Sequence, residues 1–267
     1  MQKSIILQKY NNPEDKLLVS KILDKLKFCE TRNQITNTNF VDIRQKNIII
    51  NLLNSLTFSN YICYGGFDNS ERNIFIFYPE KLNKDIVLEN IDNIIHCITI
   101  TLPKELWNTY THRNYLGGIM KLGIEREKIG DIIVSENGAS IISCADISES
   151  LIDLLATLKR FSKSKIEIIS TNALTSPEIK KEEITIIVPS LRLDSVVASL
   201  AHTSRNKALE ILSSERVLVN FETATKSSKL LNYGDIVTIR GKGRFEICSL
   251  KSTSKNGNLI VLVKGTC

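Results

Sequence analysis

The residues best suited to chemistry are cations in the last third of the chain. Ser204 precedes a predicted helix whose first turn carries Arg205 and Lys207, and Arg192 and Arg216 lie on either side in sequence. A serine at this N-cap position accepts a hydrogen bond from a first-turn amide, and the helix N-terminus attracts anions. Two cations beside such a terminus predict a phosphate-binding site, which Arg192 and Arg216 could extend along one face.

Charge counts support this interpretation only weakly. Residues 191–246 contain nine cations and six carboxylates, and the whole chain of 267 residues has a formal net charge of +6. Such values are compatible with a polyanionic partner but also occur in proteins that never bind nucleic acid. For any single cation, an ordinary solvated side chain is the alternative. Exposed cations at a helix N-terminus contribute little to folding, so Arg205 and Lys207 are expected to serve binding and not stability.

The elements that must position these residues form a compact C-terminal unit over residues 184–267. After a bridging strand at 184–188, the pattern predicts two short helices and then several short strands. The predicted helices span 191–200 and 204–212, and the predicted strands span 217–219, 236–240, 244–250 and 259–264.

This unit resembles the S4 RNA-binding domain. The resemblance rests on Arg192-Leu193-Asp194, Ser204-Arg205-Asn206-Lys207-Ala208, Arg216-Val217-Leu218-Val219-Asn220, Lys226 and Gly234-Asp235, in that order. It implies a paired-helix face and a strand loop that dock onto structured RNA, largely through phosphates. The RNA-binding residues that it implies here are Arg192, Ser204, Arg205, Lys207, Arg216, Asn220 and Lys226.

Two residues of this unit, Glu215 and Asp194, occupy positions with special roles in related sequences. Glu215 stands where the S4 family usually has a left-handed glycine after the second helix, so the turn is expected to have a different shape. Asp194 lies in an Arg-Leu-Asp motif that also carries the catalytic aspartate of many pseudouridine synthases. The short stretch of chain after Asp194 leaves no room for that catalytic domain. We therefore expect Asp194 to be structural, capping or pairing at the first helix.

Residues 73–183 are predicted to form an α/β plait, a second candidate RNA-binding domain, with a linker at its end. From Ile94 the order of expected elements is βαββαβ, which suggests a ferredoxin-like sheet with two helices on one face. The strands are expected at 73–78, 94–102, 131–135, 140–144 and 165–170, the helices at 112–122 and 148–161, and the linker at 171–183. Residues 1–72 are predicted to be mostly helical, with helices at 13–30 and 40–56. The fold class is therefore α+β.

The front of the chain carries a second resemblance. Thr38-Asn39-Phe40-Val41-Asp42, residues 65–72 and especially His112-Arg113-Asn114-Tyr115-Leu116-Gly117-Gly118 through Ile132 resemble the bacterial YlmH family. His112, Arg113, Arg126 and Lys128 surround one predicted helix and its exit, and could form a second RNA-facing patch. The alternative is that Gly117, Gly118 and Gly123 serve close packing and a C-cap while the charges are solvated.

The family resemblance implies a non-enzymatic protein that binds the large ribosomal subunit. We expect the protein to be cytoplasmic, because no apolar run is long enough to span a bilayer, and to be monomeric. The resemblance further implies quality control of stalled subunits that hold peptidyl-tRNA, with ribosomal RNA as partner and tRNA as a further candidate. One alternative is an RNA-modifying enzyme of the pseudouridine-synthase type that uses the S4 domain as an RNA handle. Another is a factor linked to cell division that binds protein. The pattern of the sequence offers no nucleotide-binding, zinc-protease or serine-hydrolase motif, so we expect no cofactor, no metal and no catalytic residue.

The remaining composition is that of a folded protein from a reducing compartment. Hydrophobic residues make up 42% and charged residues 24% of the chain, and no apolar run approaches a membrane-spanning length. Six cysteines are spread along the chain without a Cys-x-x-Cys pair, so they are expected to be free thiols.

Overall fold

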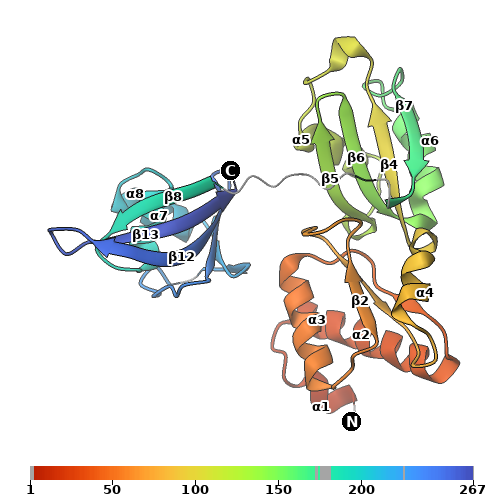
Figure 1. The fold of residues 1–267 in the computed structure, drawn as a ribbon, viewed down its shortest axis with the longest axis horizontal. Helices are drawn as coiled ribbons and strands as arrows, with labels where there is room; N and C mark the ends of the chain where they lie inside the picture. The colour runs from red at the N-terminus through yellow and green to blue at the C-terminus, as the bar shows by residue number, and fades with distance from the viewer. Residues whose placement is uncertain (1–2, 172–173, 175–181, 225, 267) are drawn as a thin grey trace. The chain divides into compact units, whose positions relative to one another are not determined.

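The computed structural model describes residues 3–171, 174, 182–224 and 226–266, and divides the chain into two units (Figure 1). The first unit comprises residues 1–177 and the second residues 178–267. Most of the predicted linker at 171–183 lies outside the described residues. The fold is mixed α+β and has three antiparallel sheets among the described residues.

The first half of unit 1 is built on two amphipathic helices, both of them predicted. Helix α2 (Pro13–Arg32) is capped by Asn12, and α3 (Ile43–Ser55) begins with a capping box between Asp42 and Gln45. Helix α1 (Lys3–Leu7) and a three-stranded sheet complete this half. The sheet order is β1 (Thr36–Asn37), β3 (Ile74–Phe77) and β2 (Tyr61–Tyr64).

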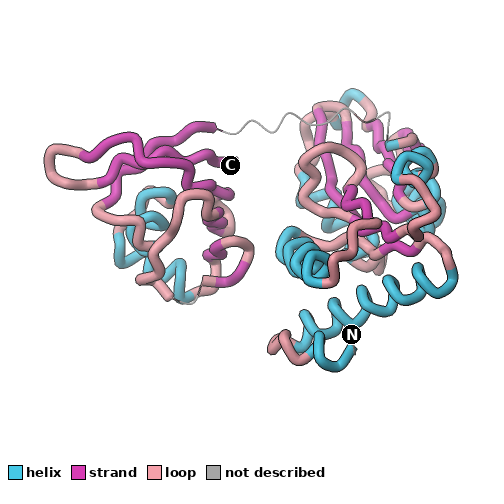
Figure 2. The backbone as a smooth tube through the Cα atoms, turned by 60° about the horizontal axis from the view of Figure 1, so that its bottom comes forward, coloured by secondary structure: helices cyan, strands magenta, loops and turns pink. Residues whose placement is uncertain are grey.

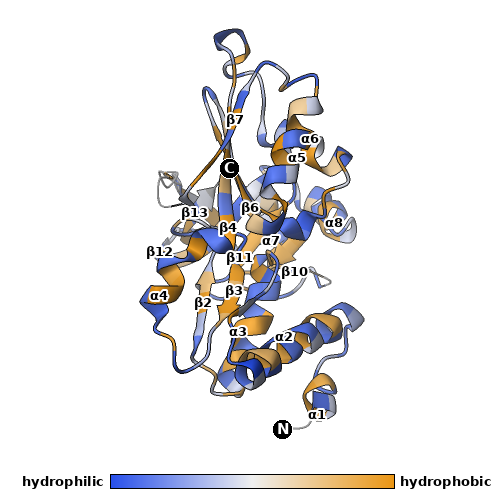
Figure 3. Ribbon diagram, turned by 90° about the vertical axis from the view of Figure 1, so that its right-hand side faces the viewer, coloured by the Kyte–Doolittle hydropathy of each residue, from blue (hydrophilic) through white to orange (hydrophobic). Residues whose placement is uncertain are grey.

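This small sheet was not foreseen in full. The strand predicted at 73–78 exists as β3, but it pairs with β1 and β2, which come before the expected boundary at residue 73. All four residues of β3 are buried, and Figure 3 shows the strand as hydrophobic. One face of β3 packs on α2 and α3 through Phe75 and Phe77, while Ile74 and Ile76 face a second core.

The second half of unit 1 follows the predicted βαββαβ order. Its elements are α4 (Lys84–Glu89), β4 (Ile95–Thr101), α5 (His112–Lys121), β5 (Ile129–Ser135), β6 (Gly138–Cys144), α6 (Ser148–Thr157) and β7 (Lys165–Ile169), with short 3-10 turns at Ile91–Asn93, Lys104–Leu106, Arg126–Lys128 and Ala145–Ile147. The four strands form one antiparallel sheet in the order β5-β6-β4-β7. Helix α4 was not predicted.

This sheet is covered on both faces over much of its length. Ile98, Ile100 and Ile141 pack against α5 and α6, whereas Cys97 and Ile142 pack against Phe40 and the β3 side of the first half. Ferredoxin-like RNA-binding modules read bases from an open sheet with aromatic residues. This sheet meets neither condition. Both of its faces are covered over much of its length, and none of its four strands contains Phe, Tyr or Trp.

Arg72 and Asp131 fasten the two halves of unit 1 together. Arg72 donates from Nε to the carbonyl of Ile129 at 3.0 Å and from Nη2 to the carbonyl of Phe40 at 3.0 Å. The Asp131 carboxylate in turn accepts from the backbone amides of Glu71 and Arg72 at 2.6 and 3.2 Å. Strand β5 is therefore tied to the chain before α3 and before β3.

Replacing Arg72 by Lys tests how much this junction contributes. A lysine ammonium keeps the charge but cannot reproduce the two donors of the guanidinium fork. We expect Arg72→Lys to lower the free energy of unfolding of unit 1 by about 1–2 kcal/mol. Urea unfolding followed by fluorescence of Trp107, the single tryptophan, reports this unit. Lys84→Ala, an exposed change on α4, is the control, and equal stability of the two variants would contradict a role for the junction.

Unit 2 packs two helices on one side of a six-stranded sheet, as Figure 2 shows. Its elements are β8 (Glu182–Val188), α7 (Leu193–Leu200), α8 (Arg205–Ser213), β9 (Val217–Val219), β10 (Glu222–Thr223), β11 (Ile236–Ile239), β12 (Gly243–Thr253) and β13 (Leu259–Thr266). The strand order is β10-β9-β11-β12-β13-β8. Both predicted helices and all the predicted strands are present, and the short strand β10 is an addition.

The turn after α8 keeps the left-handed conformation despite its glutamate. Glu215 has φ 55°, and the amides of Glu215 and Arg216 donate to the carbonyls of Leu212 and Ile211 at 3.0 and 3.3 Å. These two bonds are those of a Schellman motif, which usually has glycine at this position. The expectation that glutamate would reshape the turn was wrong, because the helix-ending bonds and packing outweigh the local strain.

Replacing Glu215 by Gly should therefore stabilise unit 2. The left-handed conformation costs a non-glycine residue roughly 1–2 kcal/mol, which glycine would not incur. Glycine also makes the unfolded chain more flexible, which offsets part of this stabilisation. We expect a net gain of about 0.5–1 kcal/mol, measurable as a rise in the melting temperature of unit 2. Glu215→Ala is the matched control, since alanine removes the same side chain and keeps the strain. An equal gain from both variants would assign the effect to the charge.

Candidate RNA-binding surface

The predicted cations of unit 2 are arranged around one buried carboxylate. Asp194, in the first turn of α7, is 3% exposed. It accepts from Arg192 Nε and Nη2 at 3.2 and 3.1 Å, from Arg205 Nε and Nη2 at 3.1 and 2.8 Å, and from its neighbour's amide, Ser195 N, at 2.9 Å. Asp194 thus holds the start of α8 against the start of α7, the pairing role predicted from the sequence.

These bonds also fix the charge of Asp194. Burial by itself would raise the pKa of this carboxyl group, but the hydrogen bonds from Arg192 and Arg205 outweigh it and lower the pKa to about 2. The carboxylate is therefore ionised at any physiological pH and saturated with donors. It leaves the two guanidinium groups partly exposed, with 39% of the Arg192 and 52% of the Arg205 side chain open to solvent.

The loop at 226–230 joins the same cluster. The amide of Leu193 donates to the carbonyl of Lys229 at 2.8 Å, and the amide of Asp194 donates to the carbonyl of Ser227 at 3.0 Å. Lys226 and Lys229 are both exposed and line a hollow of about 370 Å³. We call Arg192, Asp194, Arg205, Lys207 and the loop 226–230 the Asp194 cluster.

The N-terminus of α8 has the predicted cap. Ser204 Oγ accepts from the amide of Lys207 at 3.3 Å, and the side chain of Lys207 is exposed. Arg205 and Lys207 nevertheless differ in role, which the sequence did not reveal. Arg205 is bound to Asp194, whereas Lys207 has no ion-pair partner among the residues described for this unit.

Two other predicted residues lie apart from the cluster. Arg216 follows the other end of α8 and donates from Nη2 to the carbonyl of Arg240 at 2.9 Å. Asn220 has φ 51°, and its amide group spans the turn by donating to Asp235 at 2.8 Å and accepting from the amide of Ile236 at 2.9 Å. Both hydrogen-bonding atoms of Asn220 are thus used within the protein.

Of the four candidate residues of unit 1, two are bound within the protein and two are exposed. Arg126 is partly buried and donates to the carbonyls of Ile129 and Gly130, and burial together with nearby Arg72 lowers its pKa to about 10. Lys128 pairs with Asp146 at 2.5 Å. His112 and Arg113 are exposed at the start of α5. Desolvation of the His112 ring, together with the charge of Arg126, lowers the pKa of His112.

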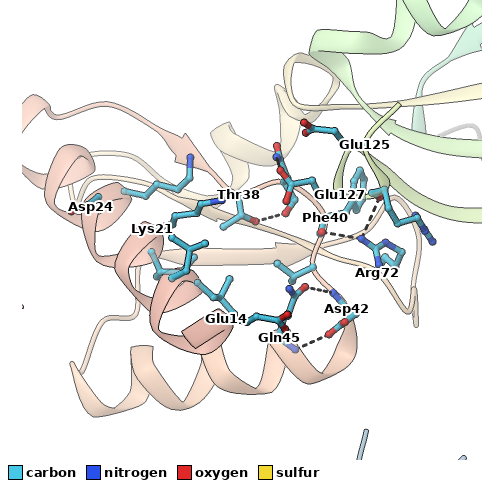
Figure 4. A pocket seen from close by; sticks show the side chains of 17 residues that line it. Glu14, Lys21, Asp24, Thr38, Phe40, Asp42, Gln45, Arg72, Glu125 and Glu127 are labelled. Atoms are coloured by element: carbon cyan, nitrogen blue, oxygen red, sulfur yellow. Dashed lines mark hydrogen bonds between the residues drawn. The ribbon is translucent and has the colours of Figure 1, made fainter. Parts of the chain in front are cut away.

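A cleft of about 1150 Å³ lies in unit 1 between α2 and the chain around Phe40 and Glu127 (Figure 4). Its wall mixes apolar side chains with carboxylates and cations. The polar groups that Figure 4 connects are engaged in structure: Arg72 reaches the carbonyl of Phe40, and Asp42 caps α3 with Gln45. This arrangement gives no acid, base or nucleophile a defined task.

Within the residues that the structure covers, no group of three His, Cys, Asp or Glu side chains is placed to hold a metal ion. The five described cysteines, Cys29, Cys63, Cys97, Cys144 and Cys248, are free thiols as predicted. Among the same residues, no helix combines the length and hydrophobicity that crossing a bilayer requires.

Comparison with known proteins finds a family domain in unit 1. Residues 89–174 match a family model described as "Putative RNA-binding domain in YlmH". This region of the chain is therefore a domain of the YlmH type. The matched region covers β4, α5, β5, β6, α6 and β7, and it contains His112, Arg113, Arg126 and Lys128.

Two individual proteins are similar over longer stretches. The chain is 26% identical over 242 residues to ribosome-associated protein quality control protein P2 of Bacillus subtilis (strain 168), an alignment that covers 91% of each protein. A solved structure of the cell division protein YlmH from Streptococcus pneumoniae is 23% identical, with a TM-score of 0.47, covering 62% of this chain and 98% of that one.

Proposed function

We propose that this protein binds the large ribosomal subunit through RNA and acts in quality control of stalled subunits that hold peptidyl-tRNA. The observation that carries the proposal is the Asp194 cluster. One buried carboxylate holds two partly exposed guanidinium groups at adjoining helix starts. Lys207 lies exposed in the first turn of α8, and Lys226 and Lys229 lie exposed on the loop bound to the start of α7. Such a fixed set of donors suits the phosphates of folded RNA.

Two further points support this proposal. The similarity to a Bacillus subtilis protein named for ribosome-associated quality control extends over nearly the whole chain. The match to an RNA-binding family domain lies in unit 1, outside the S4-like unit. We therefore propose an S4-type domain as the main anchor and a ferredoxin-like plait as the second RNA contact, with residues 1–72 as a separate helical part.

An enzymatic role is less well supported. The aspartate that would act in a pseudouridine synthase is Asp194, which is buried and bound to two guanidinium groups. A nucleophile or base needs an approachable oxygen, and both oxygens of this carboxylate are in use. We propose that Asp194 is a positioning residue for the cationic cluster.

Sedimentation of cell extract tests the proposal. We expect the protein to co-sediment with large ribosomal subunits, to be released by RNase, and to bind purified subunits with a steep salt dependence. The logarithm of the affinity should fall by about 0.7–0.9 per neutralised phosphate for each log unit of salt, because each contact releases a counterion. A salt-insensitive complex would contradict phosphate binding. Free migration with division proteins in the absence of ribosomes would favour the protein-binding alternative.

A further inference from the structure

Helix α5 carries a glycine that the fold does not need. Three glycines lie in or just after this helix. A Cβ added at Gly118 would lie 3.3 Å from Leu158 Cδ1, and Gly123 has φ 79° just beyond the helix end. Packing and termination explain these two. Gly117 is exposed, and an added Cβ there would meet no atom within 4 Å. Glycine is a poor helix former, so Gly117 weakens α5, and neither packing nor backbone conformation requires a glycine at this position.

The neighbours of Gly117 suggest what this position does. Arg113 and Lys121 stand four residues before and after it, so the three lie on one face of α5. Both cations are exposed, and neither has an ion-pair partner among the described residues of unit 1. The result is a strip of bare backbone with a cation one turn to each side.

A second element brings further cations to α5. The turn after α6 packs on this helix, because Arg160 Nη1 donates to the carbonyl of Asn114 at 2.8 Å and Phe161 stacks on Tyr115 with ring centroids 5.4 Å apart. This turn also carries Lys159 and Lys163, both exposed. Lys165 does not belong to the set, since it pairs with Glu167 at 2.8 Å.

We infer that Arg113, Gly117, Lys121 and the turn with Lys159 and Lys163 form a contact site for an RNA sugar-phosphate backbone. This inference rests on the proposed function and assigns to unit 1 a surface on its helical side. Gly117 lets a phosphate strand lie close to the helix, and the cations on both sides neutralise it. RNA is favoured over an acidic protein surface because a missing side chain removes packing contacts that a protein partner would use.

The sheet offers the main competing surface in the same domain. Much of it is buried on both faces, and the less buried positions of β4, such as the half-buried Thr99 and the exposed Thr101, carry no aromatic rings for base stacking. The helical side is therefore the better candidate for RNA, and recognition there is of the backbone and not of bases.

The test uses the full chain with Gly117→Glu. A glutamate at this position fills the strip and pairs with both flanking cations, which preserves the helix while it repels phosphate. The control is Asn51→Glu, which adds the same charge at an exposed position in the middle of α3. The probes are deproteinised 23S ribosomal RNA and large ribosomal subunits, both purified from Bacillus subtilis, measured by filter binding and by sedimentation.

We expect Gly117→Glu to weaken binding to the free RNA at least tenfold, and Asn51→Glu to change it less than twofold. Arg113→Ala with Lys121→Ala should weaken it similarly and make the salt dependence shallower by roughly 0.7–0.9 per lost contact. Gly117→Ala should raise the melting temperature of unit 1 by about 2 °C and weaken RNA binding severalfold.

The outcomes separate this inference from the proposed function. If the wild-type chain binds and Gly117→Glu binds like Asn51→Glu, the site on α5 is wrong while RNA binding stands. If Gly117→Glu weakens only the complex with whole subunits and not that with free RNA, the surface contacts a protein and the inference is also wrong. If the wild-type chain binds neither probe, the proposed function itself fails.

Discussion

Replacing the buried Asp194 by Ala is expected to lower the stability of unit 2 more than any other single change in its polar side chains. The substitution leaves Arg192 and Arg205 facing each other without the carboxylate that both of them bind. Removing one member of a buried ion pair costs up to about 5 kcal/mol, and the partial exposure of the arginines reduces that cost to roughly 2–4 kcal/mol here.

Hydrogen exchange of peptides from β9 and β11 measures this change within unit 2, while peptides from β4 and β6 in unit 1 serve as an internal reference. Glu210→Ala is the control variant, because Glu210 is an exposed carboxylate on α8. Unchanged protection of β9 in Asp194→Ala would contradict a stabilising role for the bonds of Asp194 with Arg192 and Arg205. Loss of an RNA modification in a folded Asp194→Asn variant would revive the enzymatic alternative.

The bonds of Asp194 with the two arginines also predict that the stability of unit 2 depends on pH. The pKa of Asp194 is about 2 in the folded protein against an ordinary value of 3.8, so the folded state binds this proton less tightly than the unfolded state. The stabilisation is therefore complete above pH 4 and is lost as the pH falls from about 4 towards 2. In the Asp194→Ala variant this part of the acid sensitivity of unit 2 should be missing.

Replacing both Lys207 and Lys226 by Ala is expected to have the largest effect on RNA binding. Both ammonium groups are exposed on the Asp194 cluster, where backbone and ion-pair bonds fix the elements that carry them. Two charge-assisted phosphate contacts correspond to roughly 2–4 kcal/mol, or about a 30- to 1000-fold loss of affinity, with a shallower salt dependence. Stability should change little, since exposed cations contribute little to folding.

Arg205→Ala provides the contrast. It should weaken RNA binding and also lower the stability of unit 2, because Asp194 loses one of its two guanidinium partners. The expectation from the sequence that Arg205 and Lys207 are equally dispensable for folding therefore needs correction. If the double lysine variant binds ribosomes like the wild type, the Asp194 cluster is not the anchor.

The sequence predicted the elements better than it predicted their partners. The helices at α2, α3, α5, α7 and α8 follow from apolar periodicity and from caps such as Ser204, which are local properties. Strand β3 was found, but its pairing with β1 and β2 was not, because pairing depends on contacts distant in sequence.

The candidate site shows the same limit. The pattern around Ser204 identified the cations but could not distinguish Lys207, which is open, from Arg205, which is held by Asp194. Lys229 was missed, since only the packing of its loop on Leu193 shows that it joins the cluster. Arg126 and Lys128 were predicted to face RNA, and that role stays a prediction, although both now have partners within the protein.

The strand order of unit 2 affects how the protein folds while it is being made. Strand β8 is synthesised first, yet among the described strands of unit 2 it pairs only with β13, which comes last of them in sequence. At about 5–20 residues per second, β8 would wait roughly 4–16 seconds for its partner, with Ile184, Ile186 and Ile187 unpaired. Folding of unit 2 is thus completed only after β13 has been synthesised, and a chain that loses β13 exposes an apolar edge prone to aggregation.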